Sequence, residues 1–233
     1  MQKTISVIPA AGSATRMSGI PKFLIPNSEG TPLIRWHVSQ SNLASEHTIV
    51  VTRPEWAAIT FEVLSGLKFE LQCAVTNTMT ETVIIALQSR NPAVALIHMP
   101  DTFLGEDNKL AQAVSTTLEE KQTSLICWKT RADQKGKLGQ VMFQENLDGS
   151  LEIFKIVDKD PVTTSDHHWG AIAFFQPDVQ NWDPKDSHVG ITAQKMLEKN
   201  PSLRFRAIFS NEAYYDCGTS NELSTYLQSI IKS

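Results

Sequence analysis

The chain has 233 residues, of which 41% are hydrophobic, and a formal net charge of −4. This length and composition are enough to bury a substantial core. No basic stretch dominates the sequence, so we expect no nucleic-acid partner. No apolar run approaches the roughly 18 residues of a membrane-spanning helix, and we expect a soluble, cytoplasmic protein without a membrane partner.

Short β-branched runs alternate with amphipathic segments from the N-terminus to residue 129. Strict alternation of strand and helix indicates crossover units around a parallel sheet. The strand-like runs are nearly all apolar, which is typical of a sheet covered on both faces. We predict strands over 4–9, 47–52, 69–75, 93–99 and 124–129, and helices over 32–44, 55–66, 82–90 and 108–121.

Capping residues mark two of these helix starts. Thr31 is the predicted N-cap of the first helix, with Pro32 at its first position. Thr78 and Glu81 have the spacing of a capping box at the start of the third helix.

The alternation ends after residue 129. Asp148-Gly149 lies between two strand-like runs and is a hairpin signal. Helix and strand return near the C-terminus, where Thr219 and Glu222 predict a capping box for the last helix. We predict strands over 138–143, 151–157, 167–175 and 203–209, and a helix over 190–200.

These elements predict an α/β fold, with a Rossmann-like, mostly parallel sheet flanked by helices and a small antiparallel insertion. We expect one domain over 1–233, with the insertion at about 136–176. Cys73, Cys127 and Cys217 lie far apart without a CxxC spacing, so neither a disulfide framework nor a zinc site is predicted. We expect three small buried side chains in a reducing compartment.

A loop of small residues, "PAAGSATRMSGIPK", follows the first predicted strand and carries Arg16 and Lys22. Ligands of open parallel sheets bind beyond the carboxyl ends of the strands. Small residues let backbone N–H groups approach a phosphate, while Arg16 offers a bidentate fork and Lys22 a mobile charge. The loop therefore predicts a polyphosphate site. The other interpretation is a surface loop with two solvated cations.

Two known phosphate-binding loops fit this segment less well. A dinucleotide fingerprint needs G-x-G-x-x-G, and only Gly12 is present. A Walker loop ends in G-K-[ST], which is absent here.

Two aspartates are candidate metal ligands. Asp101 ends the fourth predicted strand, and Asp216 precedes Gly218-Thr219 near the C-terminus. Mg²⁺ is typically held by one or two carboxylates together with phosphate oxygens and water. The structural alternative for Asp101 is a turn or cap residue. The two aspartates can meet only if the late segment returns to the sheet edge.

The stretch "PAAGSATRMSGIPKFLIPNSEGTPLIRWHV" resembles the opening of the sugar-phosphate nucleotidyltransferases, which include thymidylyl-, uridylyl- and cytidylyltransferases acting on sugar 1-phosphates. The family pattern is A-G-G/A-x-G-T-R, then P-K and a helix beginning k-P-l-i. The matches here are "AAGSATR", "PK" and "TPLI". Ala14 stands where the family usually has its second glycine.

The resemblance implies a role for each matching position. "YYDCGT" resembles the family's W-x-D-x-G-T element, and "LGQV", "IVDKDP" and "WGAIAFF" resemble its y-G-v-v, E-K-P and t-G-i-Y-v-f elements, with Asp158 in place of the family glutamate. The implied roles are catalysis by Arg16 and Lys22, nucleotide binding by Ala10, Ala11, Gly12, Ser13, Ala14 and Thr15, substrate binding by Gly139, Asp158, Lys159 and Gly170, and metal binding by Asp101 and Asp216.

Base selection is expected in "TNTMTETVIIAL", through Thr80 and Thr82. "TMT" and "RWHV" resemble glucose-1-phosphate cytidylyltransferases and favour CTP, with UTP and dTTP as alternatives. The other interpretation is an ordinary capped helix whose threonines serve only structure.

The resemblance implies a Mg²⁺-dependent enzyme that joins an NTP to a sugar phosphate and releases pyrophosphate. Two alternatives are a non-catalytic nucleotide- or sugar-binding module of the same fold and a transferase that uses a phospho-alcohol acceptor. The missing dinucleotide fingerprint argues against a third, a nicotinamide-dependent oxidoreductase. A homo-oligomer is an open alternative to a monomer.

Overall fold

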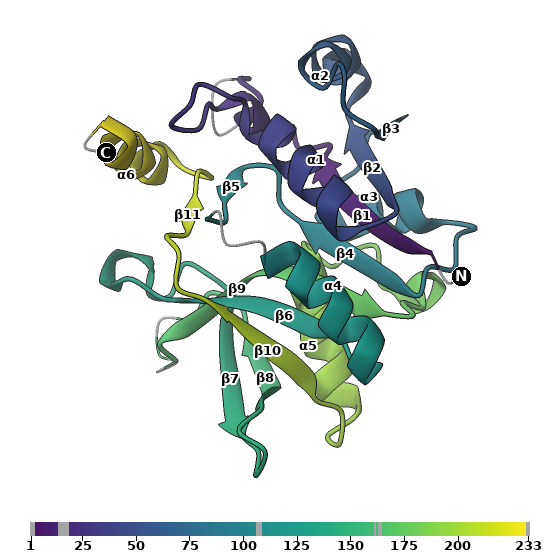
Figure 1. Cartoon of the computed structure of the whole chain (residues 1–233), viewed down its shortest axis with the longest axis vertical. Helices are drawn as coiled ribbons and strands as arrows, with labels where there is room; N and C mark the ends of the chain where they lie inside the picture. Colours follow the sequence, from purple (N-terminus) through teal and green to yellow (C-terminus); the bar gives the residue numbers. More distant parts are fainter. Residues whose placement is uncertain (1–2, 14–18, 106–108, 161, 163–164, 232–233) are drawn as a thin grey trace.

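A nine-stranded mixed sheet forms the centre of the molecule in the computed structural model, which describes residues 3–13, 19–105, 109–160, 162 and 165–231 (Figure 1). The strand order is β3-β2-β1-β4-β9-β6-β10-β8-β7, and β5 and β11 form a separate two-stranded sheet. The strands are β1 (Thr4–Ala10), β2 (His47–Thr52), β3 (Glu70–Cys73), β4 (Val94–His98), β5 (Thr102–Phe103), β6 (Ser124–Lys129), β7 (Gln140–Glu145), β8 (Leu151–Val157), β9 (His167–Phe175), β10 (Phe205–Ser210) and β11 (Tyr215–Asp216).

The helices cover both faces of the sheet. Helices α1 and α4 pack on one face, and α3 and α5 pack on the other. The α-helices are α1 (Leu33–Ala44), α2 (Ala57–Val63), α3 (Met79–Leu87), α4 (Lys109–Glu120), α5 (Val189–Lys199) and α6 (Ser220–Ile231). The 3-10 helices are η2 (Lys22–Leu24), η3 (Pro54–Trp56), η4 (Ala132–Gln134) and η5 (Val179–Asn181).

The parallel part of the sheet follows the predicted alternation. Strand β1 pairs in parallel with β2 and β4, and β2 pairs in parallel with β3. Side chains of β1 alternate between the two faces, so that Ile5 and Val7 join the core under α3 and α5 while Ile8 and Ala10 join the core under α1. Burial on both faces explains why the strands are continuous apolar runs.

The antiparallel segment is part of the main sheet. Strands β7 and β8 form the predicted hairpin, with Gly149 in a left-handed conformation at its tip (φ +79°), and they lie at the edge beyond β10. Strand β9 instead lies between β4 and β6 and is antiparallel to both. The segment expected at about 136–176 therefore supplies a central strand as well as an edge hairpin.

The predicted caps hold in part. Thr78 Oγ1 accepts the Glu81 amide at 3.0 Å, which is one of the two bonds of a capping box, while the Glu81 carboxylate accepts the Asn77 amide at 2.7 Å in place of the Thr78 amide. Helix α1, however, has Pro32 at its N-cap and no side-chain cap, so the prediction for Thr31 was wrong. The Thr31 backbone is used in a turn, because its carbonyl accepts the Asn27 amide at 2.8 Å.

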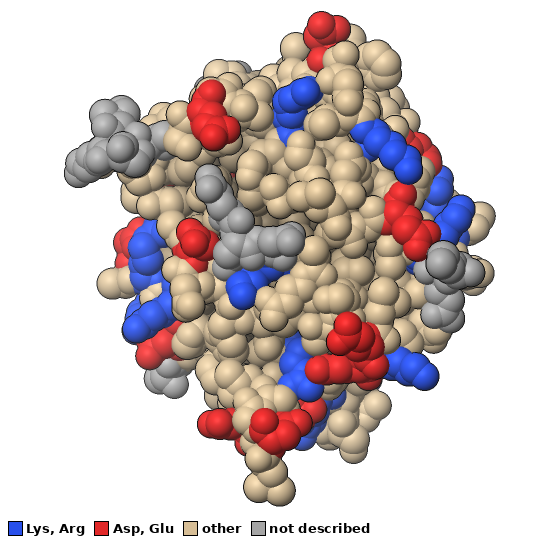
Figure 2. Space-filling view, in the orientation of Figure 1, with Lys and Arg blue, Asp and Glu red and all other residues tan. Residues whose placement is uncertain are grey.

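The cysteine expectation holds for two of three residues. Cys127 and Cys217 are buried, whereas Cys73 is exposed because it ends the edge strand β3. Among the residues that the structure describes, no helix has the length and apolarity needed to cross a membrane. Acidic and basic side chains are interspersed over the face shown in Figure 2.

The last part of the chain returns to the carboxyl end of β4. Strand β11 pairs antiparallel with β5, which follows β4 directly, and α6 then begins (Figure 1). A small apolar cluster fixes this segment against the N-terminal region, and its buried members are Ile25, Leu33, Cys217 and Tyr226.

Candidate functional site

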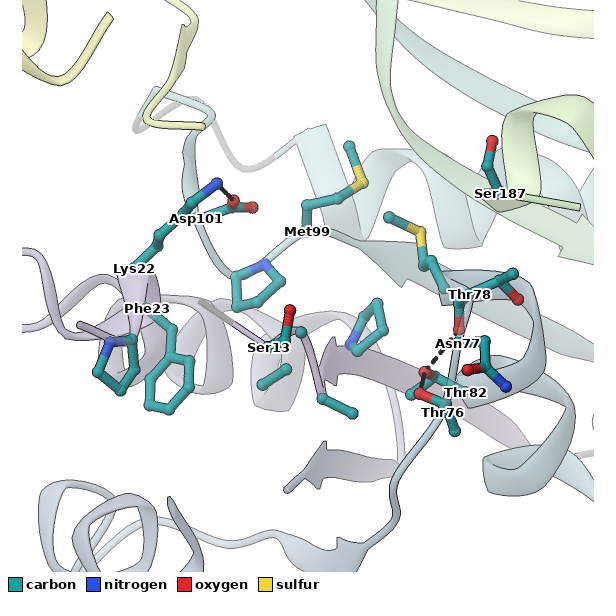
Figure 3. Close-up of a pocket in the computed structure, with 17 residues that line it drawn as sticks. Ser13, Lys22, Phe23, Thr76, Asn77, Thr78, Thr82, Met99, Asp101 and Ser187 are labelled. Carbon is teal, nitrogen blue, oxygen red and sulfur yellow. Dashed lines mark hydrogen bonds and ion pairs between the residues drawn. The ribbon is translucent and has the colours of Figure 1, made fainter. Parts of the chain in front are cut away.

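A pocket of about 350 Å³ opens at the carboxyl ends of β1, β3 and β4 (Figure 3). Its wall comes from five segments that lie far apart in the sequence. The lining residues are 9–13, 21–23, 76–79, Thr82, 99–101 and Ser187. The position agrees with the rule that ligands of open α/β sheets bind beyond the carboxyl ends of the strands.

The first loop forms one side of this pocket. Ala10 and Ala11 are buried at the end of β1, and Gly12 and Ser13 are exposed. No atom of the described residues lies within 4 Å of the position that a Cβ on Gly12 would occupy, so the backbone here is open to an approaching ligand. The predicted site residues Ala14, Thr15 and Arg16 lie outside the described residues.

Lys22 joins this loop to both acidic segments. Its Nζ donates a hydrogen bond to the Gly218 carbonyl at 2.8 Å and lies 3.5 Å from Oδ2 of Asp101. Figure 3 shows the Lys22 side chain directed toward Asp101. The Lys22 side chain is only 11% exposed, so its charge acts inside the site, where an ion pair is less screened than at the surface.

Asp101 and Asp216 converge at the same edge, although 115 positions separate them in the chain. Asp216 stands opposite Thr102 in the β5–β11 pair. The Cys217 amide donates to the Asp101 carbonyl at 3.0 Å, and the Gly218 amide donates to Asp216 Oδ1 at 2.8 Å. The strand pairing and the Cys217–Asp101 bond thus hold the two acidic segments side by side, and the Gly218 amide holds the Asp216 carboxylate within its own turn.

The charges at this edge are unbalanced. Burial, together with the negative charges of Asp101 and Glu222, raises the pKa of Asp216 to about 7, while the Gly218 hydrogen bond and Lys22 oppose the shift. A buried carboxyl beside like charges gains stability when a cation arrives. Carboxylate oxygens are the ligands that Mg²⁺ prefers, so Asp101 and Asp216 suit a magnesium ion. No group of three or more metal-ligating side chains is present in the described part of the chain, at this edge or away from it, so phosphate oxygens and water would complete the coordination of such an ion.

Glu222 is an acid that the sequence reasoning treated only as a helix cap. Thr219 is the residue that caps α6, since its Oγ1 accepts the Glu222 amide at 3.4 Å, and the Glu222 carboxylate accepts from the same hydroxyl at 3.0 Å. The charge of Glu222 nevertheless acts on Asp216. The sequence signal for this role was the position of Glu222 in the first turn of the helix that follows Asp216.

The opposite end of the pocket is built from the turn before α3. Thr82 Oγ1 lies 2.6 Å from Thr76 Oγ1 and donates to the Thr78 carbonyl at 3.0 Å. Thr78 in turn donates to the Pro184 carbonyl at 2.6 Å, which ties this turn to the segment before α5. Figure 3 shows Thr76, Thr82 and Asn77 together on this side, away from Lys22.

Only one of the two predicted base-selecting threonines lines the pocket. Thr82 does so, whereas Thr80 is fully buried and its hydroxyl has no hydrogen-bond partner among the described residues. Successive residues of a helix are rotated by about 100°, so positions two apart point in nearly opposite directions. Thr76, Asn77 and Ser187 line the pocket and were not predicted, although the polar run after the third strand was a usable signal for the first two.

The predicted acceptor residues do not line this pocket. Asp158 Oδ1 lies 3.2 Å from Nε2 of His188, and this hydrogen bond lowers the pKa of Asp158. Lys159 is exposed and adopts a left-handed conformation (φ +48°). These two residues therefore lie together at the end of β8, and His188, at the N-cap of α5, is a neighbour that the sequence did not reveal.

Packing accounts for both predicted substrate glycines. A Cβ on Gly139 would overlap the Trp169 indole, and one on Gly170 would lie 2.5 Å from Tyr214 and 2.8 Å from Trp128. The side of each glycine that a side chain would occupy is therefore filled by aromatic rings. The small size of both residues is explained without a ligand.

Solved structures match this fold over essentially the whole chain. A UDP-glucose pyrophosphorylase complexed with UDP-glucose matches with a TM-score of 0.78 and 17% identity, over 100% of this chain and 99% of that chain. A UTP-bound UGPase from Acinetobacter baumannii matches with a TM-score of 0.70 and 17% identity, over 100% and 93% of the two chains.

A further match is a Bacillus anthracis protein described as a glucose-1-phosphate thymidylyltransferase, with a TM-score of 0.80 and 13% identity over 99% of this chain and 95% of that chain. At these identities the likeness establishes the fold, and it confirms the fold class expected from the sequence. No family model matches the chain, and no curated protein matches it in sequence.

Proposed function

We propose that this chain is a Mg²⁺-dependent nucleotidyltransferase that joins an NTP to a sugar phosphate and releases pyrophosphate. The observation that carries the proposal is the meeting of Lys22, Asp101 and the Asp216–Gly218 segment beside the small-residue loop. The small-residue loop, Lys22 and Asp101 line one pocket, and Asp216 lies outside its lining in the segment paired next to Asp101. A loop with exposed backbone, a cation and two neighbouring acids suit the handling of a triphosphate.

The reaction needs little covalent help from the protein. A phosphate oxygen of the acceptor forms a bond to the α-phosphorus of the NTP, the bond from that phosphorus to the bridging oxygen breaks, and pyrophosphate leaves with the electron pair. A phosphate monoester is already a charged nucleophile near neutral pH, so a strong general base is unnecessary. Catalysis then consists of alignment and stabilisation of developing charge.

Backbone amides and cationic side chains would each bind a different phosphate group. Backbone amides of residues 10–15 and the Arg16 guanidinium would hold the departing pyrophosphate. Lys22 would bridge the α-phosphate and the acceptor phosphate. Lys22 lines the same pocket as the first loop and Asp101, which supports this role.

Asp101 and Asp216 would hold the Mg²⁺ ion. When bound, the ion would neutralise charge on the triphosphate. The raised pKa of Asp216 supports this assignment, since a buried acid beside Asp101 is stabilised by an added cation.

We propose a pyrimidine nucleotide, with CTP as the first candidate and UTP or dTTP as alternatives. Thr76 and Thr82 are the side chains in position to contact the base. The Thr82 hydroxyl donates its proton to the Thr78 carbonyl. In the contact between the two hydroxyls, Thr76 must therefore be the donor and Thr82 the acceptor. The Thr76 oxygen then keeps free lone pairs and can accept from an amine or N–H at the base edge. The choice of CTP rests on "TMT", because His37 of "RWHV" is buried in the core.

The acceptor is a sugar phosphate in this proposal, with Lys159 as the residue that holds its phosphate and Asp158 as a contact to the sugar. A phospho-alcohol acceptor is the second candidate. It is favoured by the Trp169 ring, which fills the space beside Gly139 and reduces the room for a sugar ring.

The test is a pyrophosphate-release screen of four NTPs against a panel of sugar 1-phosphates and phospho-alcohols, with and without Mg²⁺. We expect release with one pyrimidine nucleotide and only when an acceptor is present. Asp101→Asn should abolish turnover and Lys22→Ala should lower it by about 10²–10³-fold, while Asp148→Asn at the exposed hairpin tip and Lys68→Ala on the surface should leave it unchanged.

The non-catalytic alternative predicts a different result. Binding of an NTP or a sugar phosphate in calorimetry, without pyrophosphate release under any condition of the screen, would replace the transferase proposal with a binding module. Normal turnover of both Asp101→Asn and Lys22→Ala would contradict the residue roles.

A further inference from the structure

A buried chain of hydrogen bonds lies directly behind the acidic edge. The Ser41 hydroxyl lies 2.8 Å from Nε2 of His98, Nδ1 of His98 lies 2.8 Å from Nδ1 of His37, and Nε2 of His37 lies 2.7 Å from the Thr102 carbonyl. Ser41, His37 and His98 are all fully buried. The chain thus links helix α1 to the end of β4 and then to β5.

The chemistry of the groups gives this chain a single direction. The Thr102 carbonyl can only accept, so His37 carries its proton on Nε2 and accepts through Nδ1. His98 must then donate through Nδ1 and accept through Nε2, and the Ser41 hydroxyl is the donor to that nitrogen. Every ring nitrogen has a partner in this arrangement.

Both rings are neutral in this arrangement. Burial lowers the pKa of His37 to about 4, and it lowers the pKa of His98 as well, with the neighbouring His37 adding to the effect. A proton added to Nδ1 of His37 would place two donors against each other at the contact between the Nδ1 atoms, and a proton added to Nε2 of His98 would require the Ser41 hydroxyl to accept instead of donate. The chain therefore has one low-energy hydrogen-bonding state near neutral pH.

The end of the chain is next to both candidate metal ligands. Thr102 directly follows Asp101, and it is paired with Asp216 in the β5–β11 sheet. Asp101 also accepts the Cys217 amide through its carbonyl. Any shift of the Thr102 carbonyl toward or away from α1 therefore moves both acids.

We infer that His37 and His98 are positioning residues, which hold the Asp101–Thr102 segment so that Asp101 and Asp216 face one divalent cation. The inference rests on the proposed function for the identity of that cation. A buried network in which every polar group is hydrogen-bonded specifies one arrangement of its groups, whereas apolar side chains tolerate small displacements of the backbone. Groups behind metal ligands commonly change metal affinity by about 10–100-fold when they are replaced.

The first test is the tautomer of each ring, read from ¹⁵N chemical shifts of histidine-labelled protein near pH 7.5. We expect His37 to be protonated on Nε2 and His98 on Nδ1, with His37→Gln and His98→Asn spectra giving the assignments. The opposite tautomer in either ring, or a charged ring, would overturn the inference. This readout does not depend on any enzymatic activity.

The second test compares His37→Leu, which cannot donate to Thr102, with His37→Gln, which can. The probe is Mn²⁺, with free ion followed by electron paramagnetic resonance. We expect His37→Leu to weaken Mn²⁺ binding by about 10–100-fold and His37→Gln to stay within a few-fold of the unaltered protein. Equal Mn²⁺ affinity of a folded His37→Leu protein would contradict the positioning role. If His37→Leu does not fold, Ser41→Ala, which removes the first donor of the chain, replaces it in the same comparison.

Hydrogen exchange separates failure of this inference from failure of the proposed function. The Cys217 amide should exchange faster in His37→Leu than in His37→Gln, while the Asn146 amide in the distant hairpin should be unchanged. If the unaltered protein does not bind Mn²⁺, the metal proposal fails and the exchange comparison still decides the positioning role. Unchanged exchange at Cys217 would overturn it.

Discussion

Nζ of Lys22 lies 3.5 Å from Oδ2 of Asp101 and also donates to the carbonyl of Gly218, so one side chain connects three segments that are 79 and 196 residues apart. Lys22 thus places a positive charge beside Asp101 and the Asp216–Gly218 segment. A cation held here can interact with a triphosphate and with the acids that would bind its metal ion.

Lys22→Ala should therefore lower kcat by about 10²–10³-fold, by analogy with the loss of one preorganised donor. The fold should survive, because the Lys22 side chain is not part of the apolar core. Steady-state rates and a thermal melt check both statements. Lys68→Ala, on an exposed surface position, is the control and should match the unaltered protein. A Lys22→Ala enzyme with full kcat would contradict the proposed role.

Asp216→Asn should lower the activity and raise the thermal stability of the metal-free protein. The folded pKa of Asp216 is raised to about 7, so the folded protein binds its proton more tightly than the unfolded chain does. Such a group costs stability as pH rises from about 4 to about 7. In metal-free buffer at pH 8, Asp216→Asn should melt at a higher temperature than the unaltered protein, and the difference should shrink at pH 5.

The control for this comparison is Asp148→Asn. The pKa of Asp148 is lowered by its hydrogen bond to Ser150, so its replacement should give no gain at pH 8. An Asp216→Asn protein that melts below the unaltered protein at pH 8 would show that the ionised Asp216 carboxylate does not destabilise the metal-free fold.

The histidine pair predicts a loss of stability in mild acid. Both rings have lowered pKa values, and the pKa of His37 falls to about 4. Their contribution to stability is therefore complete above about pH 6.5 and is lost as pH falls toward 4, by up to about 1.4 kcal/mol per pH unit for each ring. Trp36, Ser41 and Thr102 also contact the pair and do not titrate in this range.

Urea unfolding at pH 7.5, 6 and 5 measures this slope. The His37→Gln variant carries one ring fewer and should show a shallower dependence. Parallel curves for the two proteins would mean that His37 does not need to stay neutral for the protein to fold.

Glycine substitutions should separate binding from packing. Gly12→Ala places a methyl group in open space at the pocket, so stability should be retained while KM for the NTP rises. Gly170→Ala would push against Tyr214 and Trp128 and should destabilise the protein by about 1–3 kcal/mol. Denaturation curves and KM values for both variants check the split, and a Gly12→Ala protein with unchanged KM would remove the first loop from the nucleotide site.

The two threonines of α3 give a matched pair for base recognition. Thr82→Val removes a hydroxyl that lines the pocket and should raise KM for the preferred NTP by roughly 5–10-fold, in line with the loss of about 1 kcal/mol from a hydrogen bond. Thr80→Val removes a buried hydroxyl without a partner and should leave KM unchanged. A larger KM effect at Thr80 than at Thr82 would reverse the assignment.

Local signals made most of the fold predictable. Apolar runs, capping residues and Asp148-Gly149 identified the described strands and helices of the main sheet to within a few residues, because each of these signals acts over one turn or one strand. The place of β9 between β4 and β6 was not predictable in this way, since the pairing of strands that are distant in the sequence leaves no local signal.

The site was predictable where a resemblance supplied the long-range information. The convergence of Asp101 and Asp216 followed from matching two distant motifs, and the structure brings the two segments together. The tie from Lys22 to Gly218 and the His37–His98 contact were not foreseen. Both depend on side-chain orientation in the folded core, and a histidine within an apolar helix face has no sequence mark that distinguishes packing from function.

The ³¹P spectrum of a reaction mixture containing the preferred NTP, Mg²⁺ and the accepted phosphate ester tests the central claim most directly. The account predicts that the α-phosphorus signal moves to that of a diphosphate diester while an equal amount of pyrophosphate appears, and that Asp101→Asn shows neither change. Release of pyrophosphate with nucleoside monophosphate and no diester, or an unchanged spectrum with every nucleotide and acceptor, would contradict it.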